Sequence, residues 1–239
     1  MGISARKIQI LFKKDFKDIL KNISISISMI IPLFFAVLYK YLFSDIPMPH
    51  AYLLMLVLAL NLTMTAVMIP ATSIAEEREK NTLRTLALSN VSGFEFCMAK
   101  MLVTSFFLLV TNVIIFLLMG EAVRYLPAFI VITVIGAVPL IVLGAAVGLA
   151  ARDQMTAGVY EIPLMLVFLF PTIFSDMNSV AEKIADLTPC NTVVELVLLL
   201  TDGNFLSKET LFPAMVTLAW IVVSIGIFIW LFRRKGVDN

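Results

Sequence analysis

Residues 51–75 read AYLLMLVLALNLTMTAVMIPATSIA, a run of 25 residues without a charged side chain. About 20 predominantly apolar residues are enough for an α-helix to cross the hydrocarbon core of a bilayer. Five further apolar stretches of similar length lie before and after it. The six predicted transmembrane helices are 23–43, 51–75, 101–119, 126–151, 157–174 and 211–232. They hold more than half of the chain, so we predict a single transmembrane domain over 1–239.

The overall composition supports this interpretation. Hydrophobic residues make up 60% of the chain and charged residues 15%, and the mean hydropathy is +0.98. A soluble domain has about 45–50% apolar and about 25% charged residues. The composition therefore excludes a soluble globular enzyme and a disordered chain. The apolar run at 23–43 is too long for a signal peptide and no clear A-x-A cleavage site follows it, so we expect it to be retained.

The distribution of lysine and arginine predicts the orientation, because these residues concentrate in short cytoplasmic loops. Six helices place both termini on one side, and fourteen of the 18 basic residues fall there. These fourteen are Arg6, Lys7, Lys13, Lys14, Lys17, Lys21, Arg78, Lys80, Arg84, Lys100, Arg152, Arg233, Arg234 and Lys235. The opposite side has Lys40, Arg124, Lys183 and Lys208. We expect a multi-pass plasma-membrane protein with both termini in the cytoplasm.

Two segments outside the predicted spans have an internal pattern. Apolar residues recur at helical spacing over 3–21, with the lysines mainly between them, which predicts an amphipathic interfacial helix near anionic head groups. A plain topology anchor is the alternative.

The outer segment 175–210 predicts two short helices broken at Pro189, the second dipping into the outer leaflet. Its apolar part is too short to span a bilayer.

The motifs of common catalytic sites are absent from the sequence. No glycine is followed by lysine, so the phosphate loop G-x-x-x-x-G-K-[ST] cannot be present. HExxH, GxSxG and CxxC are absent too, and His50 is the only histidine. Cys97 and Cys190 are predicted on opposite sides of the membrane, so we do not expect them to pair. We therefore expect no catalytic, metal or cofactor site, and no ATPase site, on this chain.

The predicted cytoplasmic segment 76–92 reads EEREKNTLRTLALSNVS. Glu76 and Lys80 are spaced i, i+4, which favours a helix. Leu83, Leu86 and Ala87 then form an apolar stripe. A stripe of this kind needs a surface to cover it, and either the membrane or a groove on a soluble partner would serve.

This segment resembles the permease subunits of type-2 ABC exporters, the ABC-2 family. The family pattern is roughly E-R-E-x-G-T-L-x-x-L-x-x-S-P-V-S, followed by G-K at the start of the next span. The matching residues are Glu77, Arg78, Glu79, Thr82, Leu83, Leu86, Ser89, Val91, Ser92 and Lys100. Asn81, Asn90 and Ala99 stand where the pattern has glycine, proline and glycine.

The resemblance implies partners and site residues. Two permeases would form the pore, and two copies of a separate cytoplasmic ABC ATPase would bind ATP and Mg. The segment would pack on that ATPase, and transport would be outward. The predicted ATPase-coupling residues are Glu77, Arg78, Glu79, Thr82, Leu83, Arg84, Leu86 and Ala87.

Five residues within the predicted spans are candidates for a gate or a pathway. Glu161 is the only acid in the six spans, and an ionisable residue at mid-membrane costs about 2.5–3.5 kcal/mol. A gate or partner contact and a plain interfacial position both remain open for it. Pro163 predicts a kink next to it. Phe34, Phe35 and Phe168 are expected to contact lipid. The alternative is that they line an apolar pathway for the substrate.

Gly144 and Gly148 form a G-x-x-x-G pattern, which permits two helices to approach closely. Contact within the chain is favoured over a dimer interface, because six helices offer many internal neighbours.

The sequence is thus interpreted as an all-α integral membrane protein: an amphipathic interfacial helix, six transmembrane helices, and short broken outer helices between spans five and six. The function expected from the resemblance is export of a hydrophobic or amphipathic substrate, such as a peptide, drug or lipid. Nucleic acid is not an expected partner. An ion-gradient-driven secondary transporter and a non-transporting membrane assembly protein remain as alternatives.

Overall fold

The computed structural model describes the whole chain except residues 1–3, 43–49, 83–90 and 236–239. The described residues contain helices and no strand. The helices are α1 (Ala5–Lys21), α2 (Ile23–Leu42), α3 (His50–Glu79), α5 (Gly93–Met119), α6 (Leu126–Gly136), α7 (Val138–Ala150), α8 (Gln154–Phe174), α9 (Ser179–Ala185), α10 (Pro189–Thr201) and α11 (Leu211–Lys235). Six spans are long and apolar enough to cross a membrane, with α6 and α7 forming one of them. The predicted fold class is confirmed.

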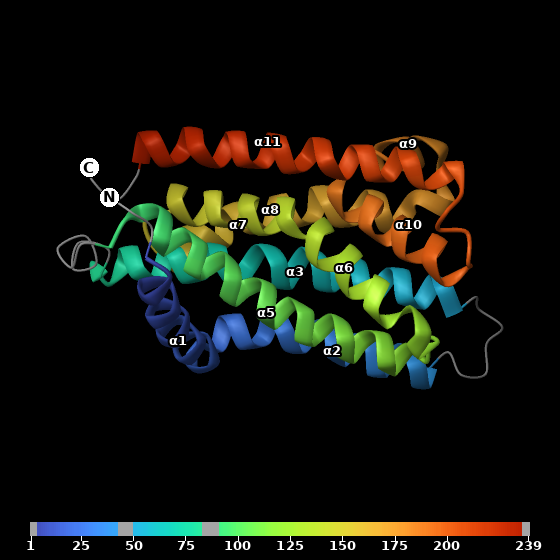
Figure 1. Ribbon diagram of the computed structural model, residues 1–239, viewed down its shortest axis with the longest axis horizontal. Coiled ribbons are helices and arrows are strands. Elements are labelled where there is room, and N and C mark those ends of the chain that lie inside the picture. The colour runs from blue at the N-terminus through green and yellow to red at the C-terminus, as the bar shows by residue number, and fades with distance from the viewer. Residues whose placement is uncertain (1–3, 43–49, 83–90, 236–239) are drawn as a thin grey trace.

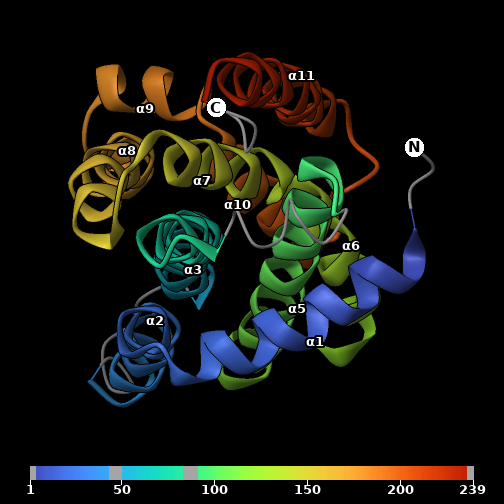
Figure 2. The ribbon, with the colours of Figure 1, turned by 90° about the vertical axis from the view of Figure 1, so that its left-hand side faces the viewer.

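The long helices run side by side, and α1 lies obliquely across one end of them (Figures 1 and 2). The last turns of α11 lie at this same end, which we call the α1 end. The opposite end, which carries α9, is called the α9 end. The chain therefore begins and finishes its described course at one end of the bundle, as an even number of crossings requires.

Helix α3 is the centre of the bundle. In its most apolar stretch 72% of the residues are buried, compared with 11% for α11. It packs against α2, α5, α7 and α8, so neighbours surround it on most sides. A helix that is apolar around its whole circumference can be buried in this way. Helix α11 and the outer faces of α2 and α8 form the apolar surface of the bundle.

The G-x-x-x-G pattern brings α7 against α3. A Cβ atom at Gly144 would lie 2.4 Å from the carbonyl oxygen of Val67, and one at Gly148 would lie 2.7 Å from that of Ala71. Only glycine permits this separation. The expected contact within the chain is confirmed.

The fourth predicted span, 126–151, is interrupted rather than continuous. Helices α6 and α7 meet at Ala137, two residues before Pro139. The ring of a proline clashes with the carbonyl four residues earlier, and proline cannot donate a backbone hydrogen bond. Pro139 accounts for the interruption.

The segment between α8 and α11 forms the two short helices α9 and α10, which are bent by 92° from one another. Pro189 is the first residue of α10, where its missing N–H costs nothing. The Thr188 hydroxyl caps this helix by accepting a hydrogen bond from the Asn191 amide at 3.3 Å. Helix α10 packs against α3, α6, α8 and α11, so it lies inside the bundle at the α9 end. Its depth in a leaflet remains a prediction.

Candidate functional site

The E-R-E motif is part of α3. The sequence predicted a transmembrane helix ending at residue 75, but α3 continues to Glu79. Successive helical residues are rotated by about 100°, since a turn holds about 3.6 residues. Glu77, Arg78 and Glu79 therefore point at three different neighbours, although they are adjacent in sequence.

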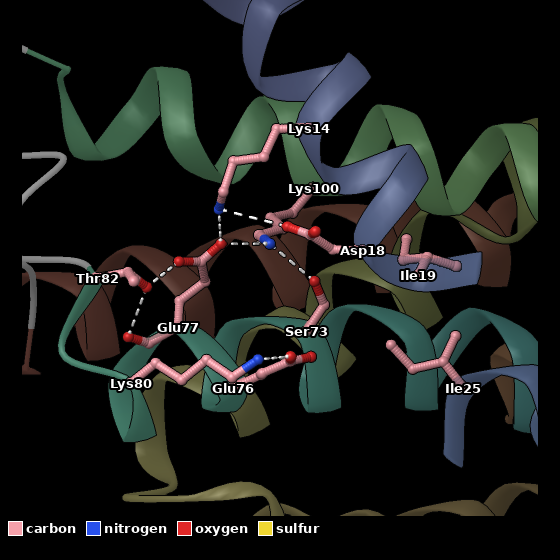
Figure 3. Close-up of a pocket in the computed structure, with 10 residues that line it drawn as sticks. All are labelled: Lys14, Asp18, Ile19, Ile25, Ser73, Glu76, Glu77, Lys80, Thr82 and Lys100. Carbon is pink, nitrogen blue, oxygen red and sulfur yellow. Dashed lines mark hydrogen bonds and ion pairs between the residues drawn. The ribbon is translucent and has the colours of Figure 1, made fainter. Parts of the chain in front are cut away.

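Glu77 faces inward, between α1 and α5. Only 6% of its surface is exposed. Its Oε1 accepts a hydrogen bond from Lys100 Nζ at 3.3 Å and forms an ion pair with Lys14 (Figure 3). Thr82 Oγ1 donates to the Glu77 carboxylate and, at 3.0 Å, to the Glu77 carbonyl oxygen. Glu77 thus joins three parts of the chain at one carboxylate.

Lys100 is the buried cation at the centre of this site, with 2% of its surface exposed. Besides Glu77, its Nζ donates to Asp15 Oδ1 at 2.8 Å and to Ser73 Oγ at 2.8 Å. A lysine ammonium has three donors, and these three acceptors use all of them. Burial raises the pKa of the Asp15 carboxyl, and the positive charge of Lys100 opposes this shift. We call Lys14, Asp15, Glu77 and Lys100 the ion network; the Lys14 side chain is 40% exposed and the other three are buried.

Arg78 and Glu79 connect α3 to the junction between α7 and α8. Arg78 donates to the carbonyl oxygens of Leu149 and, at 3.0 Å, Ala151. The last carbonyls of a helix have no partner inside the helix, so a cation there is favourable. Glu79 Oε2 accepts from the Gln154 amide at 3.2 Å, at the first turn of α8. A carboxylate is favourable at this opposite pole of a helix.

Glu76 completes the connections of α3 at this end. It forms an ion pair with Lys80 and accepts from Asn22 Nδ2 at 2.7 Å. Asn22 lies between α1 and α2 and also donates to Gln154 Oε1 at 3.1 Å. The four residues from Glu76 to Glu79 therefore contact α1, α5, α7, α8 and the α1–α2 junction.

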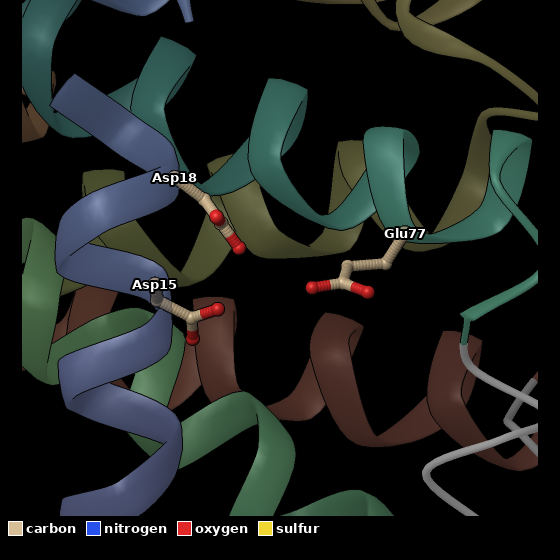
Figure 4. A group of neighbouring side chains, drawn as sticks. All are labelled: Asp15, Asp18 and Glu77. Carbon is tan, nitrogen blue, oxygen red and sulfur yellow. The ribbon is translucent and has the colours of Figure 1, made fainter. Parts of the chain in front are cut away.

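Three carboxylates at this site raise the question of a metal ion. Ligand oxygens of Asp15, Asp18 and Glu77 lie within 4.8 Å of one another (Figure 4). The ammonium groups of Lys14 and Lys100 are inserted among them, with Lys14 Nζ 3.9 Å from Asp15 and 3.7 Å from Asp18. The two ammonium groups offset two of the three negative charges and occupy the space among the carboxylates. This donor set fits an ion network and does not fit a cation site.

Sequence reasoning did not identify Asp15 and Ser73 as site residues. One signal was available for Asp15. It lies four residues from Leu11 and four from Ile19, both of which are buried, so it is an acid placed on the apolar stripe of the amphipathic helix. A charge on a buried stripe requires an opposite charge nearby. Which cation supplies it was not readable from the sequence.

Half of the predicted ATPase-coupling residues lie outside the described residues, and the rest form this site. Thr82 is the last described residue before the gap. Glu77, Arg78 and Glu79 bind within the chain as set out above. The predicted residues outside the described part are Leu83, Arg84, Leu86 and Ala87.

The predicted gate and pathway residues do not gather in one place. Glu161 is 3% exposed on the buried face of α8, and its Oε2 has no hydrogen-bond partner among the described residues. Phe168 is buried in the core, whereas Phe34 and Pro163 are exposed and Phe35 is half-buried. A gate or pathway role for them remains a prediction.

An all-helical bundle with six possible spans among the described residues is the architecture of a multi-pass membrane protein. Residues 48–234 match the family described as ABC-2 family transporter protein. The chain belongs to this family and is a transmembrane component of an ABC transporter. Helix α1 and all of α2 lie before the matched region. No curated protein matches the chain. The family favours ABC transport over the ion-driven and non-transporting alternatives.

Proposed function

We propose that this chain is the permease subunit of an exporter driven by a separate cytoplasmic ATPase. Membership of the ABC-2 family implies association with an ABC ATPase in general. The observation that supports coupling through 76–92 is the continuity of α3. The most deeply packed helix of the bundle runs directly into this segment, so a displacement of the segment acts on the centre of the bundle.

In this proposal two permeases and two ATPases form the transporter, and ATP and Mg are held by the ATPases. Closure of the ATPase pair on ATP displaces the segment and, with it, the ends of α3 and α5. A substrate of hydrophobic or amphipathic character fits best. Large apolar side chains are exposed along α2, α8 and α11, whereas the buried ion pairs of the described chain gather at the α1 end.

The coupling proposal is tested by changing the apolar stripe. A double substitution, Leu83→Asp with Leu86→Asp, is expected to remove the ATPase from the purified complex while the chain still inserts. Burial of a leucine is worth about 1.5–3 kcal/mol. Arg84→Ala is the matched control in the same segment, with a small expected effect, because exposed ion pairs contribute about 0–1 kcal/mol. The measurement is the ATPase-to-permease ratio after affinity purification of the tagged permease. A wild-type ratio in the double variant contradicts coupling through this stripe.

We also propose that the α1 end faces the cytoplasm, as the basic residues indicate. The acid Asp18 of α1 is half-exposed and pairs with Lys14. The basic side chains on the exposed face of α1 are Arg6, Lys13, Lys17 and Lys21. No ion pair among the described residues involves them. The cytoplasmic leaflet carries anionic lipids, and each basic residue near such a surface contributes about 1 kcal/mol. This orientation places that face against anionic head groups.

Orientation can be tested with single cysteines, since native Cys97 and Cys190 are buried at 2% and 0% exposure. Met155→Cys, at the α1 end, and Leu206→Cys, at the α9 end, replace residues that are 83% and 99% exposed. A membrane-impermeant maleimide applied to intact cells is expected to label Leu206→Cys and to leave Met155→Cys unlabelled. Both should react after the cells are broken. Labelling of Met155→Cys in intact cells would reverse the orientation.

A further inference from the structure

We propose that α1 is a moving part of the transport cycle and not a passive anchor. Thr82, Glu77, Lys100 and Asp15 form an unbroken series of contacts, which we call the relay, from Thr82 within the segment 76–92 to the middle of α1. Displacement of Thr82 is passed to α1 along the relay. The inference rests on the proposed function, because Thr82 lies within the segment 76–92 that would meet the ATPase.

The first contact of the relay depends on how α3 ends. Asn81 has φ = 55°, in the left-handed region, and follows directly after the last helical turn. A left-handed residue commonly ends a helix and turns the chain back, and asparagine adopts this conformation more readily than most residues. The turn places the Thr82 hydroxyl on the carbonyl and the carboxylate of Glu77. Asn81 therefore adopts the left-handed conformation at the position where the family pattern has glycine.

The second contact transmits displacement because it is buried. Glu77 and Lys100 are 6% and 2% exposed, so the contact between them is largely shielded from bulk water. An ion pair is stronger in such surroundings than in water, and an unpaired member is costly. When the Glu77 carboxylate is displaced, the lower-energy response is for its ammonium partners to follow. One of these partners, Lys14, belongs to α1 itself.

The third contact reaches the interior face of α1. Lys100 Nζ is 2.8 Å from Asp15 Oδ1, and Asp15 is 1% exposed. Helix α1 is linked to Glu77 twice, directly through Lys14 and indirectly through Lys100 and Asp15. Rings of α1 also stack on α5, with the centroids of Phe16 and Phe107 5.1 Å apart. These ion pairs and ring contacts connect α1 to the ends of α3 and α5.

The relay is tested by hydrogen exchange of the amides of Ala5–Lys21, measured by mass spectrometry on the permease–ATPase complex with and without ATP and Mg. In the wild-type complex we expect a severalfold change in the exchange rates of α1 on adding ATP. Thr82→Val removes the first contact without burying a charge, and Glu77→Gln weakens the second. Both variants should lose the ATP-dependent change in α1. Lys80→Gln is the matched control, because it removes a cation of the same helix end that lies outside the relay, and it should keep the change.

If Thr82 and Glu77 only stabilised the fold, Thr82→Val and Glu77→Gln would raise the exchange rates of α1 equally with and without ATP. The ATP-dependent difference in exchange therefore distinguishes a relay from a purely structural role. Two results would overturn the relay. One is α1 exchange that is independent of ATP in the wild-type complex. The other is an ATP-dependent change that persists in either variant whose ATPase remains bound. Failure of the wild-type chain to bind any ATPase would instead overturn the proposed function, and the inference with it.

Discussion

Lys100→Met is expected to lower the stability of the folded chain by about 3–5 kcal/mol, the usual cost of removing one partner of a buried ion pair. The carboxylates of Asp15 and Glu77 would lose their shared ammonium while they remain 1% and 6% exposed. Methionine keeps most of the side-chain volume. The fall in unfolding free energy is therefore due to removal of the positive charge and not to a cavity. The measurement is the unfolding free energy, or the unfolding temperature, of the purified chain in detergent.

Lys80→Met is the matched control for this prediction. Lys80 also pairs with a glutamate of α3, but its side chain is 61% exposed. An exposed ion pair contributes about 0–1 kcal/mol, so the control should unfold close to wild type. A second variant, Lys100→Met with Asp15→Asn, should recover part of the loss, because it removes the buried carboxylate that keeps only a 3.9 Å contact to Lys14, whereas Glu77 still pairs with Lys14. Equal stability of Lys100→Met and Lys80→Met would show that the network contributes little.

Gly144→Val is expected to disrupt the bundle at its centre. A Cβ at this position would be 2.4 Å from the carbonyl oxygen of Val67, which belongs to the backbone of α3 and cannot rotate away as a side chain can. Overpacking of a well-packed core typically costs about 1–3 kcal/mol, and a clash with backbone lies at the upper end or beyond. Helices α3 and α7 must move apart to admit the side chain. We expect a large fall in the yield of monodisperse protein on size exclusion and a lower unfolding temperature.

The control for this clash is Gly226→Val. Gly226 is also a glycine within a predicted span, on α11, but a Cβ there would meet nothing within 4 Å. The two substitutions change glycine propensity and hydropathy equally, so their difference isolates the α3–α7 contact. If Gly144→Val behaves like Gly226→Val, the close packing of these helices is contradicted.

The candidate site was only partly predictable. The sequence identified the segment containing Glu77 and, through the family pattern, Lys100. It predicted an ATPase-coupling role for Glu77, which stays a prediction, but it did not predict the burial of Glu77 against α1 and α5. The reason is the end of α3. A hydropathy pattern ends a span where charges begin, but α3 continues to Glu79, because the backbone hydrogen bonds of a helix do not require apolar side chains.

The sequence by itself determined the class of the protein, its six spans and its amphipathic first helix. Each of these depends on a local run of residues, because transfer of a helix into a bilayer depends mainly on the apolar residues within that helix. Only the tertiary structure decided which acidic and basic residues form ion pairs. Asp15 and Lys100 are 85 positions apart and belong to different helices. Their contact depends on how α1, α3 and α5 pack together, and no pattern within any one of these helices contains that information.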